Sequence, residues 1–524
     1  MRVPSPATCF ALALALAWPV AADAQGAADA EAGTCAPGRA GCYLASDGAW
    51  RNADEDHALM LGEPDPDYLR ATVEGAVFLG IGTTWYWLDK EHNLADWDYD
   101  SWRQRLSLDA FRFDNNAFYV NYVYHPVGGA YFYAFGRAND FGVLGAGIYS
   151  FLVSTGWELL IEFRERISVN DVIVTPAAGV AIGELLHKLA LYVNSTPPGR
   201  PRSHVLRWTA GAPVSLHDAL DGRQRGHEDA PVDDMGFDAA LWHDFRFAYG
   251  LSRTEARAGD AFWIHRVGLA AELVSMPGYL REGTFSRLFT DAAFTSASLS
   301  VEAGADGWGL GMVADTILLG GYWQSLARGP GGLWGEAFAA GTSLSFLYRD
   351  QDQGAFRDQL SITGLFGLSF NTTVAAGSAR LRLQGHLQPA FAGVHSAAWP
   401  LWAADHDGET AKSILRKQGY YYAWGIWARL RASVELPLVQ LGCELSYSAF
   451  DSQEGMDRTQ DAITADVDAT DRALEWTAWL RVTPFAGGPY LEAGLGGIDR
   501  RSRLEDRRAR TTLDSATLGV GITW

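Results

Sequence analysis

The C-terminal end of the chain alternates between two kinds of residue. From Thr517 to Trp524, leucine, valine, isoleucine and tryptophan occupy every second position, and threonine and glycine occupy the others. Because successive side chains of a β-strand point to opposite faces, this segment predicts a strand with one apolar face. A chain that ends on an aromatic residue in such a strand looks like an outer-membrane β-barrel, whose strands turn their apolar face to lipid.

The same alternation recurs from about residue 205 onward. Leu381, Leu383 and Leu387 alternate with arginine, glutamine and histidine, and the pattern returns in 429–436 and 476–483. Roughly 12 such segments follow one another, separated by turns that contain glycine, aspartate or proline. The sequence therefore predicts a mainly β fold, a transmembrane antiparallel β-barrel of about 12 strands over residues 201–524, with charged side chains facing the lumen.

Three stretches within this region break the alternation. Residues 252–260, 402–412 and 451–471 are charged and polar. Since the long connections of such barrels lie outside the cell, we expect these stretches to be extracellular loops.

The N-terminus predicts export from the cytoplasm. Arg2 precedes the apolar run Phe10–Trp18, and Ala22-Asp-Ala24 follows it. A charged start, a short apolar core and a small-x-small site are the parts of a cleaved signal peptide, here residues 1–24. We therefore expect the mature chain in the cell outer membrane of a Gram-negative bacterium. The formal net charge of −20 argues against nucleic-acid binding.

Residues 25–66 are rich in alanine, glycine, aspartate and glutamate and show no periodicity. This composition predicts a flexible periplasmic leader. An oxidising periplasm permits a disulfide between Cys35 and Cys42, and the alternative is two unpaired thiols. Cys443 is expected to remain as a buried thiol.

Residues 67–200 do not alternate and predict a helical module. Thr175 followed by Pro176 predicts an N-cap and first turn, with a helix continuing over 177–193. A second helix is expected over 143–165, and the glycine-rich segment 71–88 suits either a helix or a β-hairpin.

In the second of these helices, small residues and then Glu158 and Glu162 recur every four positions. Carboxylates facing lipid would be costly. We therefore expect the module to pack in or against the barrel, with this acidic stripe facing a wet cavity.

Polar residues of the module gather in short motifs. The motifs are Asn121-Tyr-Val-Tyr-His125-Pro-Val-Gly-Gly129, Ser154-Thr-Gly-Trp157-Glu158-Leu-Leu-Ile-Glu162, Ser168-Val-Asn170-Asp171-Val-Ile-Val-Thr175-Pro176 and Gly183-Glu184. Their order resembles an uncharacterised bacterial envelope family, the domain of unknown function 3943, over about residues 97–220. The resemblance implies a predicted outer-membrane protein and supplies no established reaction.

These motifs hold the candidate catalytic residues. A histidine beside desolvated carboxylates can hold and release a proton near neutral pH, and such a histidine can activate a serine as nucleophile. The candidates for this chemistry are His125, Ser154, Glu158, Glu162 and Glu184. The polar residues around them, which suit ligand binding or structure, are Asn121, Trp157, Ser168, Asn170, Asp171 and Thr175.

A purely structural role explains the same residues. Ser168, Asn170 and Asp171 are common turn and cap residues. Glu184 and Lys188 are spaced as an ion pair on one helix, and the acidic stripe has lumenal arginines as possible partners. Contiguous metal motifs are missing from the sequence, so neither a metal nor a cofactor is expected.

Three classes of function remain open at this point. The first is a plugged channel or ligand-binding protein with a polar site inside the barrel. The second is a membrane-embedded hydrolase or acyl transferase acting on envelope lipid or lipopolysaccharide, and the third is a structural envelope protein. The expected partners are outer-membrane lipid, the barrel-assembly machinery during insertion, and a small-molecule or lipid ligand.

Overall fold

The computed structural model describes residues 35–61, 65–88, 105, 107–163, 165–195, 201–209, 211–223, 225, 241–256, 261–353, 356–406, 410–484 and 488–524. The predicted signal peptide, residues 1–24, lies outside the described residues.

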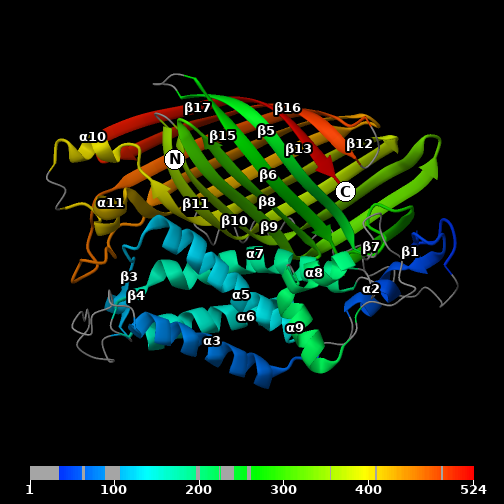
Figure 1. Cartoon of the computed structure of the whole chain (residues 1–524), viewed down its shortest axis with the longest axis horizontal. Helices are drawn as coiled ribbons and strands as arrows, with labels where there is room; N and C mark the ends of the chain where they lie inside the picture. The colour runs from blue at the N-terminus through cyan, green and yellow to red at the C-terminus, as the bar shows by residue number, and fades with distance from the viewer. Residues whose placement is uncertain are drawn as a thin grey trace.

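In the described part of the chain, twelve strands close into one antiparallel barrel, with β17 paired to β5 (Figure 1). This confirms the predicted fold class. The strands are β5 (Trp242–Ala256), β6 (Phe262–Val274), β8 (Phe294–Gly304), β9 (Gly307–Gly329), β10 (Gly332–Gln353), β11 (Phe356–Gly377), β12 (Ala379–His395), β13 (Tyr420–Glu435), β14 (Val439–Ser452), β15 (Ala469–Val482), β16 (Pro489–Leu504) and β17 (Arg507–Thr523).

The alternation in the sequence sorts side chains between the lumen and the outer wall. In β17, Leu518 is 71% exposed, and Val520 and Ile522 on the same face are exposed as well. Cys443 is also exposed on the outer face of β14, so the expected buried thiol is wrong. Side chains of the opposite parity, such as Arg429 and its partner Glu444, face each other across the lumenal side of β13 and β14.

The segment expected to be a flexible leader is ordered over residues 35–61. It forms β1 (Cys42–Leu44), β2 (Trp50–Asn52) and α2 (Ala53–Leu61). Cys35 and Cys42 are joined in a disulfide. β1 pairs with β7 (Gly283–Phe289), a short strand beside β9. Strands of three residues are too short to show periodicity, which explains why the sequence did not reveal them.

The helical module extends further along the chain than predicted. Residues 201–221 contain α8 (Pro201–Thr209) and α9 (Ala212–Asp221), so the barrel begins at Trp242 rather than at 201. Segment 71–88 lies within a helix, so of the two predicted alternatives the helix is right and the β-hairpin is wrong. The remaining helical elements are α3 (Tyr68–Leu88), η3 (Val120–Tyr124), α5 (His125–Ala138), α6 (Val143–Gly156), η4 (Trp157–Ile161) and α7 (Val169–Asn194).

Helix α7 begins at Val169, before the predicted N-cap Thr175. Its N-cap is Ser168, whose hydroxyl accepts a hydrogen bond from the Asp171 backbone N–H at 3.4 Å. Pro176 therefore lies inside the helix. A serine N-cap followed three residues later by an aspartate is a strong signal for the start of a helix. In this chain Ser168 and Asp171 determine where α7 begins, and Thr175 and Pro176 do not.

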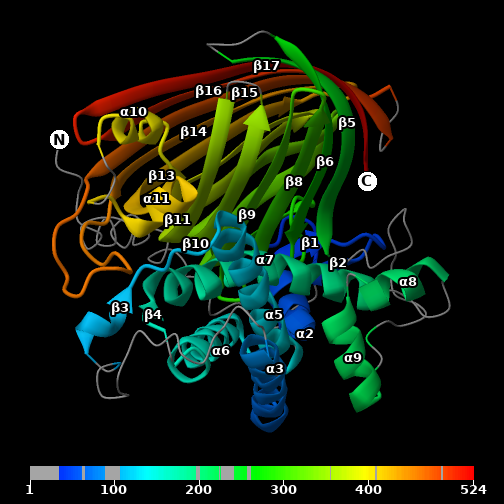
Figure 2. The same cartoon turned by 60° about the vertical axis from the view of Figure 1, so that its left-hand side comes forward.

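The module packs against the outer wall of the barrel, not inside it (Figures 1 and 2). Tyr420 and Tyr422 share the face of β13 that carries the exposed Leu430, and they pack against Phe118 and Phe113 of the module. Helix α7 contacts the same wall, where the Thr316 hydroxyl donates to the Ala181 carbonyl at 3.2 Å. Of the two predicted positions, in or against the barrel, the module takes the second, and the polar site that it was expected to form within the barrel is not there among the described residues.

The lumen is occupied by side chains of the barrel and by its longest loop. The connection between β12 and β13 contains α10 (Trp399–Ala403) and α11 (Ser413–Gln418). Trp402 and Leu415 from this loop form an apolar core with the inward-facing Tyr421 and Trp427. We call this end of the barrel the loop end, and the opposite end, where β5 begins and β17 finishes, the terminal end.

Candidate functional site

Most of the residues predicted as a site meet where the helical module joins the barrel. Two π-helical turns, η3 and η4, bring Asn121 and Glu158 to this place. Such turns widen a helix by one residue and often occur at functional sites. We call the group the junction cluster, and its members are Asp114, Asn121, His125, Glu158, Glu162, Ser168, Asn170, Asp171, Thr175, Tyr420 and Tyr422.

His125 lies at the edge of the junction cluster. Its Nδ1 is 3.4 Å from Asp171 Oδ1 and 3.3 Å from Thr175 Oγ1. Asn170 also donates to Asp171 Oδ1 at 2.8 Å. The His125 side chain is 20% exposed, whereas that of Asp171 is 4% exposed. The pair therefore places a buried carboxylate behind an imidazole that can be reached from the outer surface.

A second carboxylate links the module to the barrel. Asp114 Oδ1 accepts hydrogen bonds from Asn121 Nδ2 at 2.8 Å and from the Tyr422 hydroxyl at 2.6 Å. Asn121 Nδ2 also lies 2.9 Å from the Tyr420 hydroxyl. Because both tyrosines are on β13, these bonds fix the start of α5 against the barrel wall.

The two glutamates of the acidic stripe have different surroundings. Glu158 is 1% exposed, and its Oε2 accepts the Ser168 backbone N–H at 3.0 Å. Glu162 follows the last turn of η4 and accepts a hydrogen bond from Trp157 Nε1 at 2.7 Å. Burial, followed by the charge of Glu165, raises the pKa of Glu162 to about 8.

Two predicted catalytic residues do not take the expected places. Ser154 is buried, and the hydrogen bonds of the described residues do not include one to His125. Glu184 is 13 positions after Asp171 on α7, roughly 20 Å along the helix axis. It instead accepts from the Tyr133 hydroxyl at 2.6 Å and from Arg137 Nε at 3.0 Å.

The predicted pair of Glu184 and Lys188 is present, with 3.5 Å between Oε1 and Nζ. Lys188 also donates to Ser275 Oγ at 2.7 Å and lies 3.9 Å from Asp291. Burial alone would raise the pKa of Asp291, but the His57 hydrogen bond and Lys188 outweigh it and hold this pKa below its usual value. This network ties α7 and α2 to the turn between β7 and β8.

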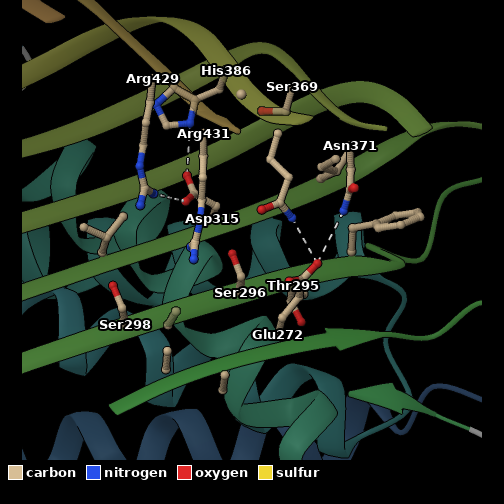
Figure 3. Close-up of a pocket in the computed structure, with 18 of the residues that line it drawn as sticks. Glu272, Thr295, Ser296, Ser298, Asp315, Ser369, Asn371, His386, Arg429 and Arg431 are labelled. Carbon is tan, nitrogen blue, oxygen red and sulfur yellow. Dashed lines mark hydrogen bonds and ion pairs between the residues drawn. The ribbon is translucent and has the colours of Figure 1, made fainter. Parts of the chain in front are cut away.

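A separate polar cavity lies inside the barrel, which the sequence did not single out. Its volume is about 110 Å³. We call it the lumen pocket (Figure 3). The polar and charged residues that line it are Arg246, Glu272, Thr295, Ser296, Ser298, Asp315, Ser369, Asn371, Gln384, His386, Arg429 and Arg431.

Both carboxylates of the lumen pocket are held by donors. Asp315 lies 3.1 Å from His386 Nδ1 and 2.9 Å from Arg429 Nη1. Glu272 Oε1 accepts from Arg382 at 2.8 Å and from Gln384 at 3.1 Å. Their negative charge is thus already neutralised within the pocket.

One guanidinium of the lumen pocket has no such partner. Arg431 forms no ion pair or hydrogen bond with any described residue, and its guanidinium lies 5.0 Å from the ring centre of Trp479. In Figure 3 it points into the space beside Asp315 and Ser296. Arg246, its neighbour in the lining, lies 3.4 Å from Asp244. The pocket therefore contains a guanidinium whose hydrogen-bond donors are not used by the described residues.

Periodicity alone does not show which lumenal charges meet. Arg246, Glu272, Asp315 and Arg431 come from four strands, and only the closed register of the barrel brings them together. The one sequence feature that pointed to this pocket was the pair of arginines, Arg429 and Arg431, on the polar face of 429–436. The sequence analysis considered such lumenal arginines as partners for the acidic stripe. In the structure Arg429 pairs with Asp315 and Glu444 instead.

Comparisons with known proteins give a family match and distant structural likenesses. No curated protein matches the chain. OmpT of Vibrio cholerae is similar at 10% identity, over 55% of this chain and 98% of its own, with a TM-score of 0.20. The KdgM porin is similar at 10% identity, over 53% of this chain and 98% of its own, with a TM-score of 0.20. Omp33 of Acinetobacter baumannii is similar at 7% identity, over 54% of this chain and 98% of its own, with a TM-score of 0.19.

The family match falls on the helical module and the junction cluster, whereas the likenesses above concern barrels. It reaches from Ala110 to Val214, close to the 97–220 over which the motifs predicted it. Residues 110–214 thus match the model of the family described as a domain of unknown function, DUF3943.

Proposed function

We propose that this protein is an outer-membrane β-barrel whose lumen pocket binds a small anionic solute. The observation that carries the proposal is Arg431, a guanidinium in a polar cavity that forms no ion pair or hydrogen bond with a residue that the structure describes. Arginine is the side chain best suited to carboxylate and phosphate groups because it offers a planar set of donors. Ser296, Ser298 and Thr295 add hydroxyl groups to the same cavity.

The outer wall of the barrel supports a membrane location. Leu387, Leu430, Leu445, Leu495 and Leu518 are each 47% exposed or more. A continuous exposed apolar band with a charged interior is the reverse of a water-soluble barrel, and it matches a barrel surrounded by lipid.

The closed loop end favours binding over free passage. Trp402, Leu415, Tyr421 and Trp427 fill the lumen there with apolar side chains. A constriction of this kind excludes water and ions. We therefore propose that solute enters the lumen pocket from the terminal end.

The test compares Arg431→Gln with Arg510→Gln, an exposed arginine paired with Asp499 on the outer part of the barrel. Binding of inorganic phosphate and of succinate to the folded protein in detergent is measured by calorimetry. We expect Arg431→Gln to weaken binding of one probe at least tenfold, because one bidentate contact is lost, and Arg510→Gln to leave it unchanged. Equal affinity in both variants, or no binding of either probe by the unaltered protein, would refute the proposal.

A second candidate function uses His125 and Asp171. A partly exposed imidazole backed by a buried carboxylate 3.4 Å away can take a proton from water at its free Nε2. This arrangement favours acid–base chemistry on an envelope lipid at the outer surface of the module.

Here we predict that His125→Gln removes a lipid product that separates wild-type cells from cells lacking the protein, as measured by mass spectrometry of envelope lipids. Tyr131→Phe, an exposed position on the same helix, should leave that product unchanged. If wild-type and deletion strains have the same lipid profile, this second function is wrong.

A further inference from the structure

The helical module has an apolar outer face that no described part of the chain covers. On α3, Val73, Val77, Ile81 and Trp85 are 53% to 67% exposed. Between Ala71 and Leu88 the only charged residue is Glu74, which is 2.8 Å from His217. In water, an exposed face of this size would favour aggregation.

Helix α6 continues the same kind of surface. Leu144, Ile148, Phe151 and Leu152 are 43% to 77% exposed, and Val143–Gly156 contains no charged residue. Two helical segments, Val143–Ile161 and Val169–Asn194, are long and apolar enough to cross a membrane. Helix α3, with 21 residues, is roughly 32 Å long, which matches a hydrocarbon layer of about 30 Å.

These helices extend between the two ends of the barrel. At the start of α7, Arg112 donates to the Gln460 carbonyl in the loop between β14 and β15, at 3.3 Å. Near the other end of α7, Lys188 bonds Ser275, directly after β6. Helix α7 therefore follows the barrel wall from the loop end to the terminal end, as Figure 2 shows.

Aromatic side chains mark both ends of the module. Tyr119, Tyr124 and Trp85 are 52% to 65% exposed near the loop end, and Tyr68 and Trp208 are 69% and 49% exposed near the terminal end. Tyrosine and tryptophan concentrate where a bilayer meets water, because each ring has an apolar body and a polar edge.

Four ionisable groups in the centre of the module are buried away from this face. Glu158, Asp171, Glu184 and Lys188 are each at most 3% exposed. Glu158 and Asp171 accept hydrogen bonds from within the module, and Glu184 pairs with Lys188. Ionisable groups that face inward and have hydrogen-bond partners are the arrangement that a hydrocarbon surrounding requires.

We propose that the module lies within the lipid layer beside the barrel, with α3 and α6 facing acyl chains. The occupant of this face is lipid rather than a second copy, because the face continues the exposed apolar band of the barrel wall and has tyrosine and tryptophan at both ends. Helices thus take the place of lipid over part of the wall from β8 to β13. This inference rests on the proposed membrane location of the barrel.

The experiment measures the surroundings of single nitroxide labels in the full chain folded into phospholipid vesicles. Cys443, exposed on β14, serves as the lipid-facing reference. Ile148→Cys tests α6, and Asp306→Cys, in the turn between β8 and β9, provides a reference exposed to water. All three proteins are made with Cys9 replaced by serine, and the last two with Cys443 replaced as well. Collision with oxygen and with a water-soluble nickel chelate is compared at each position.

We expect the label at 148 to resemble the label at 443, with oxygen collisions at least threefold more frequent than at 306 and nickel collisions suppressed. A label at 148 that behaves like 306 while 443 reports lipid would overturn the inference and leave the barrel proposal intact. Shielding from both reagents would indicate a protein partner on α6 and would also overturn it. If 443 itself reports water, the proposed membrane location fails.

Discussion

At the scale of single residues, the junction cluster concentrates acidic groups that cannot all be ionised at low cost. Asp114, Glu158, Glu162 and Asp171 share one buried region with a single imidazole, His125. Like charges at close range, out of water, favour the protonated form of at least some members. The spacing of Glu158 and Glu162 predicted that both project from one helix face, but the group that each one contacts could be known only from the fold.

Glu162 gives a pH prediction. Its pKa in the folded protein is about 8, above the ordinary value of 4.5, so the folded state binds this proton more tightly than the unfolded state. The stability that protonation provides is fully present below pH 4.5 and is lost as the pH rises from 4.5 to 8. We therefore expect Glu162→Gln to reduce the fall in thermal midpoint between pH 5 and pH 9, measured in detergent.

The matched control for this prediction is Asp306→Asn, which changes an exposed carboxylate in a turn. It should retain the full pH dependence of the unaltered protein. The prediction fails if Glu162→Gln and the unaltered protein lose equal stability over the same range.

At the scale of elements, α5 and α7 approach so closely that their backbones touch. A Cβ added to Gly179 would lie 2.5 Å from the carbonyl carbon of Gly129, and one added to Gly129 would meet the Thr175 carbonyl. Small residues permit this contact, as they do between helices in membranes. Gly128, one position away, has open space around it.

Gly179→Ala should therefore separate the two helices and destabilise the module by about 1–3 kcal/mol, the usual cost of overpacking. Gly128→Ala should be neutral or stabilising by about 0.5–1 kcal/mol, because alanine restricts the unfolded chain. Urea unfolding followed by circular dichroism at 222 nm measures both. Similar losses in the two variants would contradict the helix contact.

The elements also show what sequence patterns can and cannot predict. Strand alternation predicted β12, β13, β15 and β17 because each of these strands has one exposed apolar face and one face in the lumen. The position of α7 was not predictable. A stripe of small and acidic residues specifies that a helix packs closely, but not whether it packs inside a barrel or outside.

At the scale of the whole molecule, the outer wall of the barrel has a part that the module covers and a part that is exposed. The module packs on part of the wall from β8 to β13. Leucines elsewhere on the wall are exposed, among them Leu387, Leu430, Leu445, Leu495 and Leu518. The lumen is closed at the loop end and carries its own network of ion pairs. Contacts in the lumen join strands that are far apart in the sequence. The lumen pocket forms only when the barrel closes, so no sequence motif could predict it.

The buried charges of α7 have a consequence for how this helix finds its place. Helix α7 has 26 residues, with Glu184 close to its centre and Lys188 one turn further on. A charged residue at a helix centre disfavours insertion of that helix into a bilayer by about 2.5–3.5 kcal/mol. The ion pair between Glu184 and Lys188 therefore keeps α7 from entering a bilayer by itself, so that the helix depends on the barrel wall and the other helices for its position.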